Sequence, residues 1–400
     1  MSVPHNCLIN DIRESSALRG YTFSKYKTSD VKKQFLDTML NGKIEPACYW
    51  CAELICAGHY GDIWEVIFIF IGKYIHTSNP KIAVYLEKRY TVFRNIIAQG
   101  GFISELELRN NSTIRQLFSE IITIITLSVK KNSFESIKIK RENEFDMTQM
   151  KERLKAPSIK FAEDILHPED PNEIYIAVNE FSYHIGSKTS NMLQACYWIE
   201  WLIEFDLICR KRKQPCICKR RSVNVENKYQ CDLIWVVWDS LIYYSKNAKV
   251  NPSMAKKLLL SLKELFTAKY TPGSAKKRKY LLYFAVEIIT EHYSIENELF
   301  TQHTKQILSN VTQKINLIYK QIKKNEESPN TDYLFNNLDT KHNFERSLRQ
   351  LEMVNSVDIM NMTDISMTIK DDEDVESALC RRITPNVPFY TFEDLNRTFR

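Results

Sequence analysis

The chain has 400 residues, a formal net charge of +6 and only 9 glycines. This length is enough for two domains that each bury a core of their own. So few glycines argue against most β-rich folds and against glycine-rich nucleotide loops, which need glycine where φ is positive or where the backbone approaches a phosphate. The sequence contains no GxGxxG, P-loop or GxSxG motif, and we expect an all-α protein.

The amino-terminal residues 1–13 are polar and lack the apolar core of a signal peptide. The ten cysteines have irregular spacing, and we therefore expect reduced thiols in a cytosolic-type compartment. Ser29-Asp30 predicts the start of a helix that ends at Asn41-Gly42.

Four landmarks then occur twice in the same order. Ala-Cys-Tyr-Trp begins at positions 47 and 195, and an Ile-Trp pair follows at 63 and 234. Asn-Pro comes next, at 79 and 251, and Glu-Ile-Ile-Thr ends each series, at 120 and 287. Self-similarity of this kind is the signature of a repeated structural unit. The sequence therefore predicts two tandem copies of one multi-helix unit.

The repeated segments have the pattern of buried helices. Residues 195–208 are apolar almost all round, and Glu200 and Glu204 form the only polar stripe. Asn-Pro suits a helix start, because asparagine caps the helix and proline fits its first position. All six tryptophans lie in the landmark segments, where we expect them to be core residues.

The domain organisation follows from these landmarks and from composition. We predict an N-terminal segment over 1–28, a helical repeat over 29–130, a charged linker over 131–171, a second repeat over 172–322 with a basic insert at 209–231, and an acidic, largely disordered tail over 323–400.

The basic insert makes the second copy longer than the first. From Ala-Cys-Tyr-Trp to the next landmark tryptophan the second copy has 23 more residues, and the surplus falls where the chain turns basic. We expect the insert to lie outside the packed body, because seven cations cannot be buried without partners. Such density could neutralise phosphates without sequence specificity, or it could be a solvated loop or an import signal. The hypothetical nucleic-acid contacts, here and in a second cluster, are Arg210, Lys211, Arg212, Lys213, Lys219, Arg220, Arg221, Lys276, Lys277, Arg278 and Lys279.

Four cysteines accompany the insert: Cys209, Cys216, Cys218 and Cys231. A zinc ion held by their thiolates is an alternative interpretation, but their spacing matches no standard zinc finger, and we assign no metal. The cysteines between residues 48 and 56 do not form a better zinc site. In a helix, Cys48 and Cys56 would lie about 12 Å apart along the axis, which is too far to bind one ion.

No catalytic residue, cofactor or small-molecule substrate is predicted. Glu287, Glu291 and His292 lie within two turns of one helix, but the Glu-x-x-His spacing of di-iron bundles is missing. A surface or interface role for these glutamates is the preferred interpretation.

The tail differs from the body in charge. Residues 326–380 contain 13 acidic and 4 basic side chains, a net charge of −9, whereas residues 1–325 carry +13. Such a tail could shield a polyanion-binding surface, or it could act as a solubiliser. The aromatic segment 385–400 could dock on a partner or fold back on the body.

At its landmarks the chain resembles an uncharacterised protein family shared among nucleocytoplasmic large DNA viruses. The likeness is carried by residues 195–205, by the Asn79-Pro80-Lys81 helix start with Tyr85-Leu86, and by residues 235–238, and it would cover about residues 29–300. The resemblance implies a virus-encoded, cytoplasmic or virion protein of a replication or assembly compartment, with no known activity or site residue. The two helical repeats also resemble the tandem cyclin boxes of cyclins and transcription factor IIB, as an analogy of fold only.

We therefore expect a protein that acts by binding. The first hypothesis is a non-catalytic viral interaction or scaffold protein with protein partners. The alternative is a nucleic-acid-associated factor in viral transcription that uses the basic residues on phosphates. An enzyme with an unrecognised helical site is a third possibility.

Overall fold

A computed structural model describes residues 3–100, 104–141, 145, 147–186 and 190–327. The regular elements of these residues are all helices, which confirms the all-α fold. Two isolated β-bridges, Tyr21–Lys27 and Ile217–Asp232, are the only strand-like pairs in this part of the chain. Of the predicted tail over 323–400, residues 323–327 are described and begin with the 3-10 turn η9, and the disorder predicted for the others falls on residues outside the described part.

The first half of the chain forms the helices α1 to α5. Their bounds, with the short 3-10 and π-helical turns between them, are η1 (His5–Cys7), α1 (Thr28–Leu40), α2 (Ile44–Cys56), α3 (Tyr60–Phe70), η2 (Ile71–Ile75), η3 (His76–Ser78), α4 (Ile82–Gln99), η4 (Glu105–Asn110) and α5 (Ser112–Leu127).

The second half forms the helices α7 to α14, of which the last returns to the first half. Its elements are α7 (Met147–Arg153), η5 (Ile159–Ala162), η6 (Asn172–Ile174), α8 (Tyr175–Gly186), α9 (Met192–Lys211), η7 (Asn227–Tyr229), α10 (Ile234–Tyr244), η8 (Ser245–Asn247), α11 (Pro252–Phe266), α12 (Pro272–Lys277), α13 (Lys279–Thr290), α14 (Gln302–Ile322) and η9 (Lys323–Asn325).

Asparagine caps explain several of the helix starts. The Asn251 side chain accepts a hydrogen bond from the Met254 amide at 3.0 Å, and Pro252 occupies the first helical position. In the first copy the expected cap at Asn79 does not form. There α4 begins at Ile82, and the Asn79 side-chain oxygen is buried without a hydrogen-bond partner in the described part of the chain.

Helix packing follows the same pattern in the two halves. In the first, α1 packs on α2 and α3, and α2 packs on α5. In the second, α8 packs on α9 and α10, and α9 packs on α13. The landmarks lie on or just before α2 to α5 in the first half and on α9, α10, α11 and α13 in the second. The superposition of the halves and the domain boundaries remain predictions.

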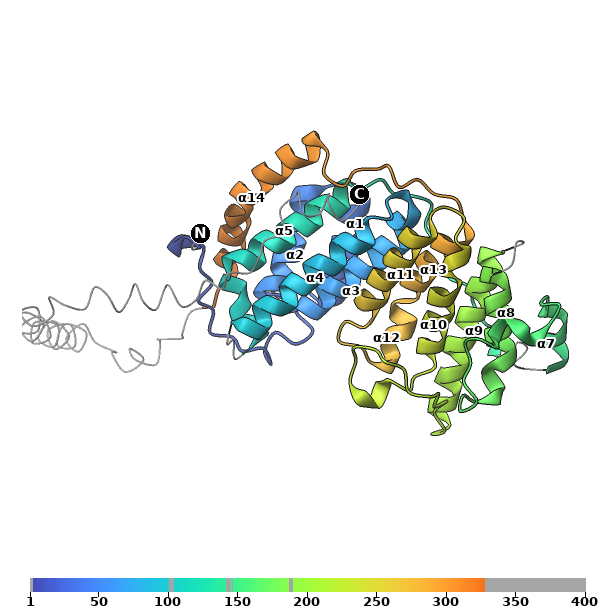
Figure 1. The fold of residues 1–400 in the computed structure, drawn as a ribbon. Coiled ribbons are helices and arrows are strands. Elements are labelled where there is room, and N and C mark those ends of the chain that lie inside the picture. Colours follow the sequence, from blue (N-terminus) through green and yellow to red (C-terminus); the bar gives the residue numbers. More distant parts are fainter. Residues whose placement is uncertain (1–2, 101–103, 142–144, 146, 187–189, 328–400) are drawn as a thin grey trace, which may run out of the picture.

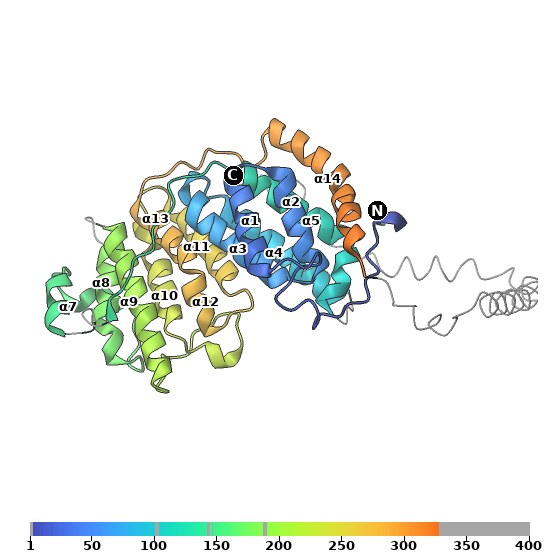
Figure 2. The ribbon, with the colours of Figure 1, turned by 180° about the vertical axis from the view of Figure 1, so that it is seen from behind.

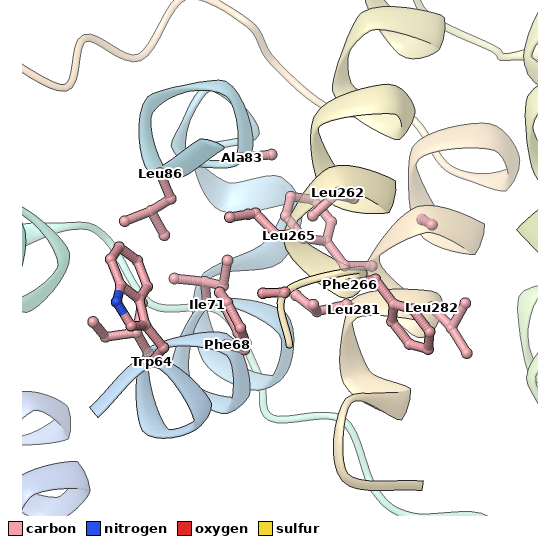
Figure 3. Packing of buried hydrophobic residues seen from close by; sticks show 14 of the residues in the cluster. Trp64, Phe68, Ile71, Ala83, Leu86, Leu262, Leu265, Phe266, Leu281 and Leu282 are labelled. Atoms are coloured by element: carbon pink, nitrogen blue, oxygen red, sulfur yellow. The ribbon is translucent and has the colours of Figure 1, made fainter. Parts of the chain in front are cut away.

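The two halves share one hydrophobic core, and the molecule is elongated along the row of helices (Figures 1 and 2). At its centre α4 packs on α11, and α13 packs on α3 and η2. Figure 3 shows this junction, where Trp64 and Phe68 of α3 face the same core as Phe266 of α11 and Leu281 of α13.

The helix α14 connects the halves a second time. It belongs to the predicted second repeat in sequence, but it packs on α5 and α2 of the first half. The buried Arg115 guanidinium stacks over the Tyr319 ring at 3.8 Å, which fixes α14 against α5. No helix in the described residues is long and apolar enough to cross a bilayer.

One glycine at the junction permits a close backbone contact. A Cβ atom added at Gly72 would lie 2.7 Å from the carbonyl carbon of Tyr280 in α13. We expect Gly72→Ala to destabilise the protein by about 1–3 kcal/mol, because two backbones must separate. Gly61→Ala is the control, since nothing lies within 4 Å of the corresponding atom. Urea unfolding that gives the two variants equal stability would contradict this account.

Candidate functional site

Many of the predicted phosphate contacts form ion pairs within the protein. Six of the eleven cations have carboxylate partners: Arg210, Lys219, Arg221, Lys276, Arg278 and Lys279. Among the other five, Arg220 donates to the side chains of Gln230 and Asn227. The predicted set therefore divides into cations that pair with groups of the protein itself and cations that stay exposed at the surface.

Arg221 corrects the expectation that the insert lies outside the packed body. It is 6 % exposed and donates two hydrogen bonds of 2.6 Å to Asp170, and its Nε lies 3.2 Å from Asp239. Burial alone would raise the pKa of Asp170, but hydrogen bonds from Arg221 and from two backbone amides outweigh it and lower that pKa. The buried charge is tolerated because its partner is buried with it.

The second basic cluster holds helices together. Lys276 pairs with Glu204 at 2.5 Å and Lys279 with Glu200 at 2.6 Å, so the polar stripe of α9 faces these cations. Arg278 is 4 % exposed and pairs with Glu65 of α3 at 2.5 Å. The Arg278 pair therefore links the second half to the first.

A smaller basic surface remains at the end of α9. Lys211, Arg212 and Lys213 are exposed, and none of them has an ion-pair partner within the described residues. Cations in the last turn of a helix also stabilise its dipole, so their position has a structural explanation as well.

The cysteines of the insert do not form a metal site in the described residues. Cys216 and Cys218 are buried, and the Cys218 amide donates to the Cys231 carbonyl at 2.9 Å. A hydrogen bond with Cys216 and burial raise the pKa of the Cys218 thiol, which keeps its proton. No group of three or more His, Cys, Asp or Glu side chains in the described ranges could hold a metal ion.

Glu287 lies inside the protein, at the junction of the halves. It is 2 % exposed and lies 2.7 Å from Nδ1 of His76 and 2.6 Å from Nζ of Lys131. Burial favours a raised pKa for Glu287, but these two partners outweigh it and lower the pKa.

A cleft of about 400 Å³ opens beside this junction, and sequence reasoning did not predict it. One wall comes from the start of α3 and from α4, and the other from the segment between α11 and α13. Trp64, Tyr90 and Phe93 line the first wall and are at most 5 % exposed, while Lys269 and Lys277 stand on the opposite wall. These walls are about 200 residues apart in sequence, so no local pattern could have brought them together.

Three polar groups among the residues that line this cleft have no hydrogen-bond partner in the described part of the chain. They are the indole N–H of Trp64, the hydroxyl of Tyr60 and Oε2 of Glu65. Burial raises the pKa of Tyr60, so its hydroxyl keeps its proton and can donate. Each such group, when buried, costs about 1–3 kcal/mol relative to a hydrogen-bonded one.

The corresponding tryptophan of the second half has a partner. Nε1 of Trp235 donates to the backbone carbonyl of Tyr229 at 2.7 Å. Tyr229 lies in η7, inside the insert that the first half lacks. The insert thus supplies a peptide carbonyl to one landmark tryptophan, whereas the other lines an open cleft.

The ion pairs predict which cations are structural. We expect Arg221→Ala to destabilise the protein by about 3–5 kcal/mol, because it leaves Asp170 buried without its charged partner. Arg212→Ala, which removes an exposed and unpaired cation, should change stability by less than about 0.5 kcal/mol. Thermal unfolding distinguishes the two, and equal midpoints would show that Arg221 is not a structural residue.

Substitution by phenylalanine is expected to lower the stability by different amounts at Trp64 and at Trp235. Both substitutions remove the same atoms, but only Trp235→Phe removes a hydrogen bond, and the Tyr229 carbonyl then keeps only the 3.2 Å bond from the Asp232 amide. We expect Trp235→Phe to cost about 1 kcal/mol more than Trp64→Phe in urea unfolding. An equal loss would mean that the hydrogen bond to Tyr229 contributes nothing.

Comparison of the chain with protein-family models, curated proteins and solved structures finds no match. The resemblance to a viral family and the analogy with cyclin boxes therefore remain predictions. The geometry of the cleft and of the remaining basic surface is the basis for assigning a function.

Proposed function

We propose that this chain is a non-catalytic interaction protein that holds an extended segment of a protein partner in the cleft between its halves. The observation that carries the proposal is the cleft of about 400 Å³ between the halves, with Trp64 on one wall and Lys269 and Lys277 on the other. Trp235 has a peptide carbonyl on its indole N–H, and Trp64, beside the cleft, has none in the described residues. The viral replication or assembly setting, in the cytoplasm or virion, stays a prediction from the resemblance.

A peptide backbone suits the unpartnered groups in this wall. Each residue of an extended peptide offers a carbonyl acceptor and an amide donor. The carbonyl can accept from Trp64 or Tyr60, and the amide can donate to Oε2 of Glu65. All three atoms are buried in this structure, so a peptide backbone reaches them only when these side chains turn toward the cleft. The aromatic surface beside them supports the binding of an apolar side chain, as aromatic residues do at the centre of many interfaces.

The test uses one variant that blocks the cleft and one matched control. Gly61 lines the cleft, and nothing lies within 4 Å of a Cβ added there, so Gly61→Phe should fill the space without a clash. Gly273 is equally open but lies outside the lining, and Gly273→Phe adds the same side chain there. A displayed library of random peptides is selected on the full chain, and binding is measured by fluorescence anisotropy.

Selected peptides should bind the unmodified protein and Gly273→Phe equally, and should bind Gly61→Phe at least about tenfold more weakly. This binding should not weaken as salt is added, because the contacts of the peptide are backbone hydrogen bonds and apolar contact. If the selected peptides bind Gly61→Phe as well as the unmodified protein, the cleft is not the binding site.

The basic surface at the end of α9 supports a second candidate function, a nucleic-acid-associated factor. Lys211, Arg212 and Lys213 are exposed without ion-pair partners in the described residues, which leaves them available to phosphates. Arg210 is excluded from this set because it pairs with Asp206 and Asp232.

Reversal of these three cations to glutamate should abolish oligonucleotide binding if they contact phosphates. The matched control reverses three exposed cations elsewhere, Lys314, Lys320 and Lys324. Affinity for an unmodified oligonucleotide should fall steeply between 50 and 200 mM salt, roughly a thousandfold for six or more contacts and less for three. Equal loss in both triple variants would indicate only a general effect of net charge.

A further inference from the structure

We propose that the acidic run of this chain itself, residues 371–376, docks in the cleft over Trp64 and competes there with the partner segment. The proposal rests on the proposed function, because it takes the cleft to be a site for an extended peptide. Five of these six residues are acidic: Asp371, Asp372, Glu373, Asp374 and Glu376.

Charge at the rim of the cleft favours an acidic occupant. Lys277 is exposed on the wall formed by α12 and has no ion-pair partner within the described ranges. Lys269 stands on the same wall and pairs with Glu105. The acids of the opposite wall are already neutralised, since Asp62 pairs with Lys32 and Glu65 with Arg278. A carboxylate that enters the cleft therefore meets cations first.

The short helix η4 lies between the end of the described chain, at Glu327, and the cleft. The Glu327 amide donates to Asp11 at 2.8 Å, and the Asp11 carbonyl accepts from Arg109 of η4 at 3.0 Å. At the other end of η4, Glu105 pairs with Lys269, and Leu106 lies against Gly58 of the cleft lining. Six residues of 3-10 helix span only about 12 Å.

The intervening chain is long enough for this contact. Residues 328–370 could span about 140 Å when extended, many times the length of η4. Attachment to the same chain also gives the segment an effective concentration in the millimolar range, so a weak intrinsic affinity suffices. The end of α9, with the exposed Lys211, Arg212 and Lys213, lies toward the far end of the molecule from α14 (Figure 1).

Zero-length carbodiimide cross-linking of the full chain tests the proposal. The reagent joins a carboxylate and a lysine amine that are in contact, and mass spectrometry identifies the joined peptides. We expect links from residues 371–376 to Lys277 or Lys269 within one chain, at least about fivefold more abundant than links to Lys211 or Lys213. Gly61→Phe should abolish these links, and the matched Gly273→Phe should retain them.

A full-chain variant with the five acids changed to their amides separates this inference from the proposed function. It should bind the library-selected peptides about tenfold more tightly than the unmodified chain, because the competitor is weakened. If the peptides bind at the cleft but the amide variant gains nothing, the inference fails alone. If Gly61→Phe binds the peptides as tightly as the unmodified chain does, the proposed function fails as well.

Three other outcomes would overturn the inference directly. Links mainly to Lys211 or Lys213 would place the acidic run on the end of α9. Links between isotopically labelled and unlabelled chains would identify a second copy as the occupant. An absence of links from residues 371–376, or their persistence in Gly61→Phe, would show that the acidic run does not enter the cleft.

Discussion

Buried ion pairs at the junction fix how the two halves meet. Arg278 reaches from the second half to Glu65 of α3, and Glu287 of α13 faces His76 and Lys131 of the first half. In a core of low dielectric a charge without its partner is strongly unfavourable, so only one relative position of the halves satisfies both sets. The apolar contacts of α4 with α11 supply attraction, and the ion pairs select the register. The cleft lies beside α12, at the same junction.

The sequence predicted the helices because their signals are local. Apolar periodicity, the Asn251 cap and the low glycine content act over a few residues, and the structure confirms the all-α fold that they indicate. The sequence also showed the polar stripe of Glu200 and Glu204, and it showed the basic cluster around Lys276. What the pattern did not show was that these two features are partners, 72 residues apart for Glu204 and Lys276.

The candidate site depended almost wholly on contacts that are distant in sequence. Arg221 looks like its neighbours in a basic run, and only the position of Asp170 in the folded chain makes it a buried residue. The cleft is formed by segments near residues 60 and 270. The sequence of each segment is that of an ordinary helix end or loop. A usable signal was present in the repeat itself. The insert beside Trp235 implied that the two tryptophans have different surroundings.

The position of α14 has a consequence for synthesis. The faces of α2 and α5 that it covers are made by residue 127, but α14 is complete only at residue 322. At about 5–20 residues per second, roughly 10–40 s pass between the synthesis of those apolar faces and the synthesis of the helix that covers them. A nascent chain in this state exposes the surfaces that chaperones bind. The production of folded protein therefore depends on chaperone supply during this interval more than a chain of two self-contained halves would.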